Sequence, residues 1–140
     1  MLLNREALLK KDKVKIEKVT FDDGDFVYVR EMSGRSKECW EQSLLEEVKD
    51  DDGNVIDYKR SLTDLRAKLA VNTLCDANGI LLLKPEDYNL LSQNKKAERL
   101  EKIADVAAGL NSIRPIDQKA LVKNSGGALG ADSNSGSAKK

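Results

Sequence analysis

Hydrophobic and polar residues alternate in two short runs near the N-terminus, and this alternation predicts the first elements of the fold. The runs cover residues 14–21 and 25–32 and flank the turn sequence DDGD. Alternation on both sides of an Asp-Gly turn is typical of an antiparallel β-hairpin. In the second run, from Phe26 to Val29, apolar side chains point to both faces, so we expect helices to pack on the hairpin.

Two helices are predicted, one on each side of this hairpin. A short helix is expected directly after Asn4, because asparagine is a good N-cap. Further along, Trp40, Leu44 and Val48 lie at i, i+4 and i+8, which places them on one face of a helix. This spacing predicts a helix over residues 33–49, ended by the acidic turn DDDGN.

The second half of the chain has the strongest helical patterns. Residues 61–75 are apolar on two sides, which is typical of a helix at the centre of a fold. The turn DANG then precedes a short apolar strand over residues 80–83 and a helical turn that begins at Pro85. A last helix follows, capped by Ser92 or Asn94. Its apolar face is formed by Ala97, Leu100, Ile103, Ala104, Ala107 and Leu110.

The composition fits a single soluble domain. The chain has 140 residues, of which 40% are hydrophobic and 34% charged, with a formal net charge of zero. Because Lys and Arg are not concentrated in one region and no apolar run reaches about 20 residues, we expect neither a nucleic-acid nor a membrane partner. Residues 1–115 are predicted to form one globular α+β domain, and residues 116–140 a flexible tail rich in Gly, Ser and Ala.

These patterns together predict the fold class. We expect an α+β fold that is mostly α-helical, with a small N-terminal β-hairpin packed on helices and a disordered C-terminal tail. The two cysteines, Cys39 and Cys75, lie in apolar patterns and are interpreted as buried small side chains.

The sequence offers no group that is typical of catalysis or metal binding. It contains no histidine, which removes the usual general base and the commonest metal ligand. The acidic turns DDGD, DDDGN and DANG do not have the ligand spacing of an EF-hand loop around their glycines, so they are predicted to be turns. We therefore expect a protein that is not an enzyme, with no catalytic residues, no metal and no cofactor.

The order of turn and packing residues in the second half resembles that of a known family. The features are, in order, Asp76, Gly79, the strand over 80–83, Glu86-Asp87, and a helix that ends near Leu110-Asn111. This order resembles the C-terminal half of the tail assembly chaperones of long-tailed bacteriophages. The upstream sequence DGDFVYVREMSGRSKECWEQSL resembles their N-terminal part, so the resemblance covers residues 14–112. Leu83 stands where family members often have phenylalanine.

The resemblance implies a function and a set of partners. Tail assembly chaperones coat the long, hydrophobic tape-measure protein, keep it soluble and help recruit tail-tube subunits around it. The chain is accordingly expected in the host cytoplasm while a phage or prophage tail is assembled, and not in the mature virion. In many such phages a ribosomal frameshift adds a second domain to some copies, and the segment from Asn124 would suit such a junction.

The surplus of apolar residues in so small a domain predicts a partner-binding surface. We place it on the helix over 97–110 or the strand over 26–29, which would bind a partner as a helix in a groove or by strand addition. The candidate partner-binding residues are Val27, Val29, Leu100, Ile103, Ala107 and Leu110. Two other interpretations stay open: a structural virion component, such as a head–tail adaptor or tail-completion protein, and a bacterial binding module without a phage role. The oligomeric state is also open, a homo-oligomer included.

Overall fold

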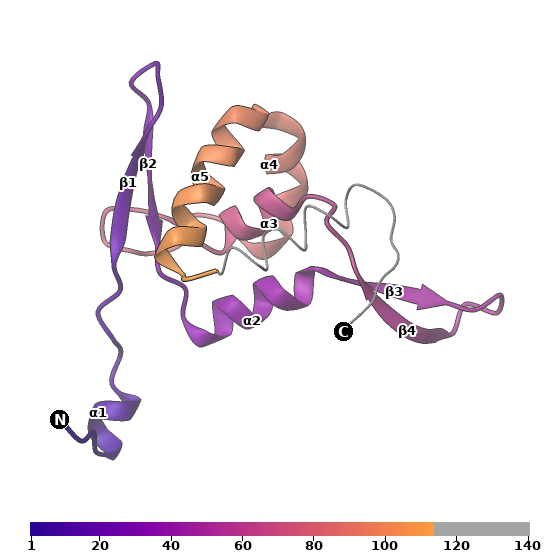
Figure 1. Cartoon of the computed structure of the whole chain (residues 1–140), viewed down its shortest axis with the longest axis horizontal. Helices are drawn as coiled ribbons and strands as arrows, with labels where there is room; N and C mark the ends of the chain where they lie inside the picture. The colour runs from indigo at the N-terminus through magenta and orange to yellow at the C-terminus, as the bar shows by residue number, and fades with distance from the viewer. Residues whose placement is uncertain (114–140) are drawn as a thin grey trace, which may run out of the picture.

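The computed structural model of the chain describes residues 1–113, which form five α-helices, one short 3₁₀-helix and five strands in two sheets (Figure 1). The elements are, in chain order, α1 (Arg5–Leu9), β1 (Ile16–Thr20), β2 (Phe26–Arg30), α2 (Gly34–Ser43), β3 (Leu45–Lys49), β4 (Val55–Arg60), α3 (Leu65–Val71), β5 (Leu74–Cys75), η1 (Pro85–Asp87), α4 (Tyr88–Asn94) and α5 (Ala97–Leu110). The domain boundary expected at residue 115 and the tail expected over 116–140 lie outside the described residues.

The prediction of a mostly helical fold with one small hairpin is wrong, because the chain has a mixed α and β structure with two sheets. The first sheet has the strand order β1-β2-β5, and the second is the two-stranded sheet β3-β4. The helix that contains Trp40 ends at Ser43, and the residues that follow turn away as a strand. The helical spacing of Trp40, Leu44 and Val48 therefore crosses a boundary between two kinds of element.

The acidic turn DDDGN connects two strands and does not end a helix. The Asp50 side chain accepts hydrogen bonds from the backbone N–H of Asp52 at 3.0 Å and of Asn54 at 2.9 Å. The backbone N–H of Asp50 also donates to the Asn54 carbonyl at 2.9 Å. Such bonds stabilise a tight turn, and they position β4 antiparallel to β3.

The N-terminal hairpin is confirmed, and it gains a third strand. β1 and β2 pair antiparallel from Ile16 opposite Arg30 to Thr20 opposite Phe26, and β5 pairs with the other edge of β2. Val29, at the centre of this sheet, is fully buried. The expectation that helices cover the hairpin is also confirmed, since α5 packs on both β1 and β2 (Figure 1).

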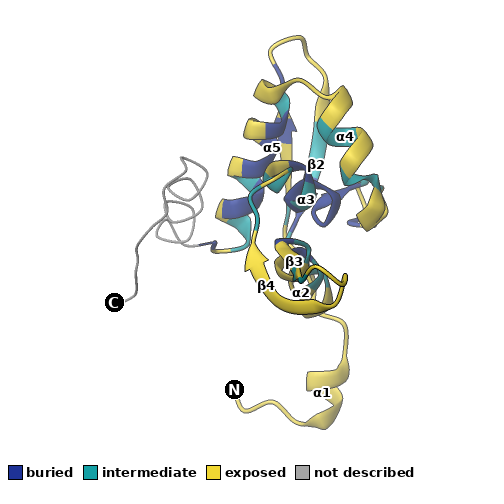
Figure 2. Cartoon of the chain, turned by 90° about the vertical axis from the view of Figure 1, so that its right-hand side faces the viewer, coloured by how far each residue is buried: buried dark blue, intermediate teal, exposed yellow. Residues whose placement is uncertain are grey.

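The predicted central helix exists, but it is shorter than expected. α3 begins at Leu65 because Asp64 before it has a left-handed backbone with a φ of 57°, and its end gives way to β5. Four of its seven residues are buried, and it packs against α5 and α4. Figure 2 shows the buried residues gathered where α3, α5 and β2 meet.

Two parts of the fold project from this core. α1 buries no residue, although Asn4 caps it as expected by accepting the Ala7 N–H at 3.0 Å. Every residue of β4 is exposed, and β3 buries none (Figure 2). No helix in the described part of the chain is both long enough and apolar enough to cross a membrane.

Candidate functional site

The six residues expected to bind a partner come together in the structure, but inside the domain. Val29 on β2 is buried against the core, as are Leu100, Ile103 and Ala107 on α5. Val27 and Leu110 are half-buried and pack on the same core. These side chains hold β2 and α5 together, and two of them, Leu100 and Leu110, also line open hollows of the surface.

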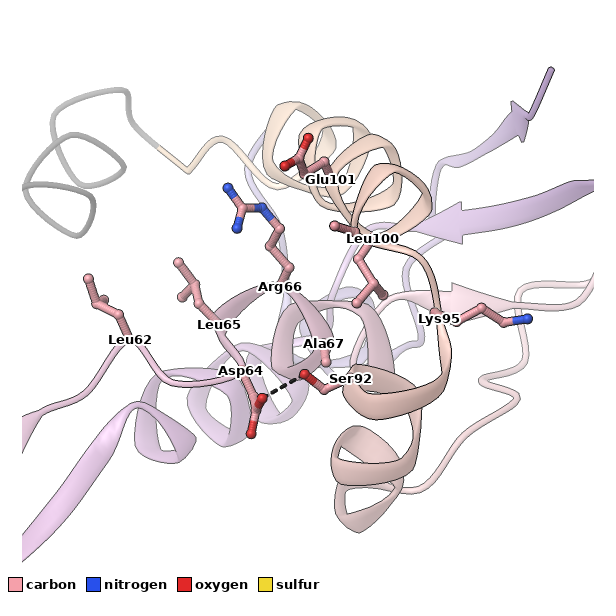
Figure 3. A pocket seen from close by; sticks show the side chains of 10 residues that line it. Leu62, Asp64, Leu65, Arg66, Ala67, Ser92, Lys95, Leu100 and Glu101 are labelled. Carbon is pink, nitrogen blue, oxygen red and sulfur yellow. Dashed lines mark hydrogen bonds between the residues drawn. The ribbon is translucent and has the colours of Figure 1, made fainter. Parts of the chain in front are cut away.

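An open groove lies beside this core, between the start of α3 and the junction of α4 with α5. Its volume is about 400 Å³. The apolar part of its lining consists of Leu62, Leu65, Ala67, Ala97 and Leu100. In Figure 3, Leu62 and Leu65 lie beside one another and extend in the same direction, which gives the groove one continuous apolar wall.

The opposite side of the groove is fixed by a hydrogen bond between two elements. The Ser92 hydroxyl of α4 donates to the Asp64 carboxylate at 2.6 Å (Figure 3). Asp64 is one of few residue types that adopt a left-handed backbone at modest cost. This conformation turns the chain between Leu62 and Leu65, and the bond to Ser92 holds the turn against α4.

Charged side chains surround the apolar part of the groove. Arg66 and Lys95 supply positive charge and Glu101 supplies negative charge, and all three are exposed. Figure 3 shows Arg66 extending from α3 on the side where Glu101 extends from α5. An apolar floor with polar groups of both signs at its margin is typical of a site that orients an amphipathic ligand.

Of the six candidate residues from the sequence, only Leu100 lines this groove. Leu62 and Leu65 lie within residues 61–75, which the pattern predicts as one helix, whereas Leu62 precedes α3 and Asp64 interrupts the helical backbone. The useful signal was the second apolar side of residues 61–75. Leu62 and Leu65 belong to this pattern, are only half-buried, and line the groove.

The aspartates that carry the family resemblance stabilise turns. The Asp76 carboxylate accepts hydrogen bonds from the backbone N–H of Asn78 at 2.8 Å and of Ile80 at 3.1 Å. Asp87 accepts from the Lys84 N–H at 2.8 Å, at the start of η1. Both are local side-chain-to-backbone bonds of the kind that define tight turns and helix starts.

Gly79 and Asn111, which also belong to the resemblance, fix the end of β2. The Gly79 carbonyl accepts a buried hydrogen bond from the Arg30 guanidinium at 2.7 Å. The side-chain oxygen Oδ1 of Asn111 accepts the Met32 N–H at 2.6 Å, and the side-chain nitrogen Nδ2 donates to the Ala107 carbonyl at 2.9 Å. The motif of the second half is therefore architectural, because it ties β2 to the turn after β5 and to the end of α5.

The first acidic turn, DDGD, holds a cation from α5. The Arg99 guanidinium donates to the carboxylates of Asp23 and Asp25 and lies over the Phe21 ring. The backbone N–H of Asp25, followed by Arg99, holds the pKa of the Asp23 carboxyl below its ordinary value. The pairs are at the surface, so their contribution to stability is small.

The remaining reactive groups do not converge. Cys75 is buried, and burial raises the pKa of its thiol, while Cys39 is half-buried. Among residues 1–113, no three His, Cys, Asp or Glu side chains are grouped as metal ligands would be. We therefore take the groove beside α3 and α5 as the candidate binding site of the described residues. Comparison of the chain with known proteins found no matching family model, no matching curated protein and no matching solved structure.

Proposed function

We propose that this protein is a tail assembly chaperone of a phage or prophage, which binds the tape-measure protein, keeps it soluble and helps recruit tail-tube subunits. The observation that carries the proposal is the open groove with an apolar wall and a charged margin beside α3 and α5. The tail context comes from the resemblance over residues 14–112.

The groove suits an amphipathic helix. Such a helix exposes an apolar stripe with residues three and four positions apart. Leu62 and Leu65 would contact that stripe, while Arg66 and Glu101 would face the polar flanks of the same helix. A volume of about 400 Å³ accommodates only a few side chains, so one site binds a short part of a long partner.

Weak binding at each site is compatible with this function. A tape-measure protein presents apolar stripes along its whole length, and many copies of a small chaperone can cover it together. Low affinity at each site lets the copies leave when tube subunits take their place. The protein acts on its partner by covering apolar surface, and no bond is made or broken.

The test is co-expression of the chain with the tape-measure protein encoded beside it. In the Leu62→Glu variant a charge replaces an apolar wall of the groove, and Leu62 lies outside the buried core. Leu90→Glu is the matched control, since Leu90 on α4 is 62% exposed and does not line the groove. We expect the original chain and the control to keep the tape-measure protein soluble and to co-purify with it, and Leu62→Glu to lose both properties.

Two results would reject the proposal. The first is full solubilisation by a folded Leu62→Glu variant, with circular dichroism and thermal unfolding used to check the fold. The second is the presence of the chain as a stoichiometric component of purified virus particles, because that result favours a structural virion component.

A further inference from the structure

The β3-β4 sheet has an edge that nothing covers in the part of the chain that the structure describes. β4 pairs with β3 on one side, and the two strands form a sheet of their own. Every residue of β4 is exposed, including Ile56 at 63% and Tyr58 at 57%. A two-stranded sheet that is exposed on both faces is marginally stable alone, and its free edge is a template for a further strand.

The hydrogen-bond pattern shows which residues of β4 face this edge. At the base of the hairpin, the Ser61 N–H donates to the Leu44 carbonyl at 2.6 Å. Antiparallel ladders bond at every second residue, so Lys59 and Asp57 bond to β3 and the residues between them face outward. The outward-facing residues of this regular part of the ladder are Tyr58 and Arg60, and the register shifts by one residue at Ile56, which has no partner on β3. In the single chain, the backbone N–H of Tyr58 donates to the Asp57 carboxylate at 2.8 Å. This outward-facing donor is therefore occupied by a side chain and not by a neighbouring strand.

We propose that β4 pairs antiparallel with β4 of a second copy of this chain, about a two-fold axis at Tyr58. The result is a continuous four-stranded sheet with the order β3-β4-β4-β3. The two Tyr58 residues then exchange backbone hydrogen bonds, and Arg60 of each copy lies opposite Ile56 of the other, at the bulge of its hairpin. On the opposite face, Asp57 lies directly across from the second copy's Lys59, and this pair occurs twice.

The charges along β4 select this register over its neighbours. Two alternative registers place the two-fold axis at Asp57 or at Lys59. In the first, two aspartates lie opposite one another, and in the second, two lysines do. An axis at Arg60 places two arginines opposite, and an axis at Ile56 leaves Asp57 and Lys59 without a partner of opposite sign. Directly opposed like charges destabilise a sheet and opposed unlike charges stabilise it. Only the axis at Tyr58 gives each charged residue on that face a partner of opposite sign.

The apolar side chains favour the same arrangement. Tyr58 is opposite Glu47 in the hairpin, and Arg60 is opposite Leu45, so these four side chains share one face. Pairing through β4 places the two copies of Tyr58 across from each other, and aromatic cross-strand pairs are favourable. The edge disappears at the same time, since each outward N–H and carbonyl gains a backbone partner.

This inference goes beyond the proposed function and does not depend on it. The edge of β4 and the groove at Leu62 use different residues, and self-association is measured on the chain alone without a tape-measure protein. A failure of the pairing therefore leaves the groove proposal intact, and a failure of the groove proposal leaves the pairing intact.

The experiment is sedimentation velocity of the full chain over a roughly hundredfold range of concentration. The variants are Asp57→Lys and Lys59→Glu, measured singly and as an equimolar mixture. Each variant alone places like charges opposite one another in the dimer, whereas the mixture restores two pairs of opposite sign. Lys49→Glu on β3 is the control, because it makes the same charge change away from the β4 edge.

We expect the original chain and the control to dimerise as concentration rises. Each single variant should weaken dimerisation at least about tenfold in dissociation constant, and the mixture should recover it as a heterodimer. Lys59→Glu also faces Glu46 within its own hairpin, and recovery in the mixture shows that its hairpin is still formed. A monomer at all concentrations, a dimer that both variants leave unchanged, or a mixture without recovery would overturn the proposal.

Discussion

Replacement of Gly79 by alanine tests how tightly the turn after β5 packs against the first sheet. Gly79 has a φ of +83°, and a Cβ atom placed on it would lie 3.1 Å from Ile16 Cδ1 and 3.3 Å from Val14 Cγ2. Gly24, in the turn between β1 and β2, has a φ of +93° and would meet no atom within 4 Å. The two positions therefore share a left-handed backbone and differ in the space around them.

The expected costs follow from this difference. A left-handed backbone costs an L-residue about 1–2 kcal/mol, and this is the whole expected cost of Gly24→Ala. At Gly79 the new methyl group also displaces the ends of Ile16 and Val14, and overpacking of this kind adds about 1 kcal/mol. Ile16 Cδ1, the nearer of the two, is the end of its side chain and has to move by only a few tenths of an ångström, so we place this addition at the low end of the usual range.

The assay is urea unfolding followed by the fluorescence of Trp40, which is buried and is the single tryptophan of the chain. We expect a lower midpoint for both variants with an unchanged slope, and the free energy of unfolding of Gly79→Ala to be about 1 kcal/mol below that of Gly24→Ala. Equal costs at the two positions would refute the reasoning, because Ile16 and Val14 would then not confine residue 79.

Three other predictions concern the core and the surface charges. Asn111→Ala should lower the free energy of unfolding by about 2 kcal/mol, since the Met32 N–H loses its acceptor and the Ala107 carbonyl its donor, and Asn111→Asp should also destabilise because it sets a carboxylate oxygen against that carbonyl at the end of α5; an unchanged midpoint for either variant in urea unfolding would contradict this role. Trp40→Phe should cost less than about 1.5 kcal/mol by thermal unfolding, against about 3–5 for Trp40→Ala, because the buried Trp40 Nε1 has no hydrogen-bond partner among residues 1–113; a large loss for phenylalanine would count against it. The lowered pKa of Asp23 stabilises the fold above its ordinary value of 3.8, and this contribution is lost as pH falls through the lowered value. The melting temperatures of Asp23→Asn and the original chain should therefore differ slightly near about pH 7 and converge near about pH 2, and a gap that persists in acid would exclude this linkage.

The sequence was sufficient to predict the elements whose signals are local. Alternation around DDGD identified the first hairpin, and Asn4 identified the start of α1. The β3-β4 hairpin was misinterpreted because Leu44 and Val48 continue the helical spacing of Trp40. A local signal for it did exist, since Asp52-Gly53 precedes Val55, Ile56 and Tyr58, which are residue types that favour strands.

The candidate site was harder to predict because it depends on tertiary structure. With aromatic residues at only 4% of the chain, the core is built from small and aliphatic side chains, and Val29 and Leu100 are needed inside it. Their apolar character therefore gave no information about a free surface. The groove depends on the left-handed backbone of Asp64 and on its bond to Ser92, and neither follows from periodicity.

The most direct test of the central claim is photo-crosslinking in the complex with the tape-measure protein. A benzophenone side chain is placed at Leu62, in the groove, and in a separate variant at the exposed Leu90. We predict efficient crosslinks to the tape-measure protein from position 62 and few from position 90. Equal crosslinking from both positions, or crosslinking from position 90 alone, would contradict the claim that this groove binds the partner.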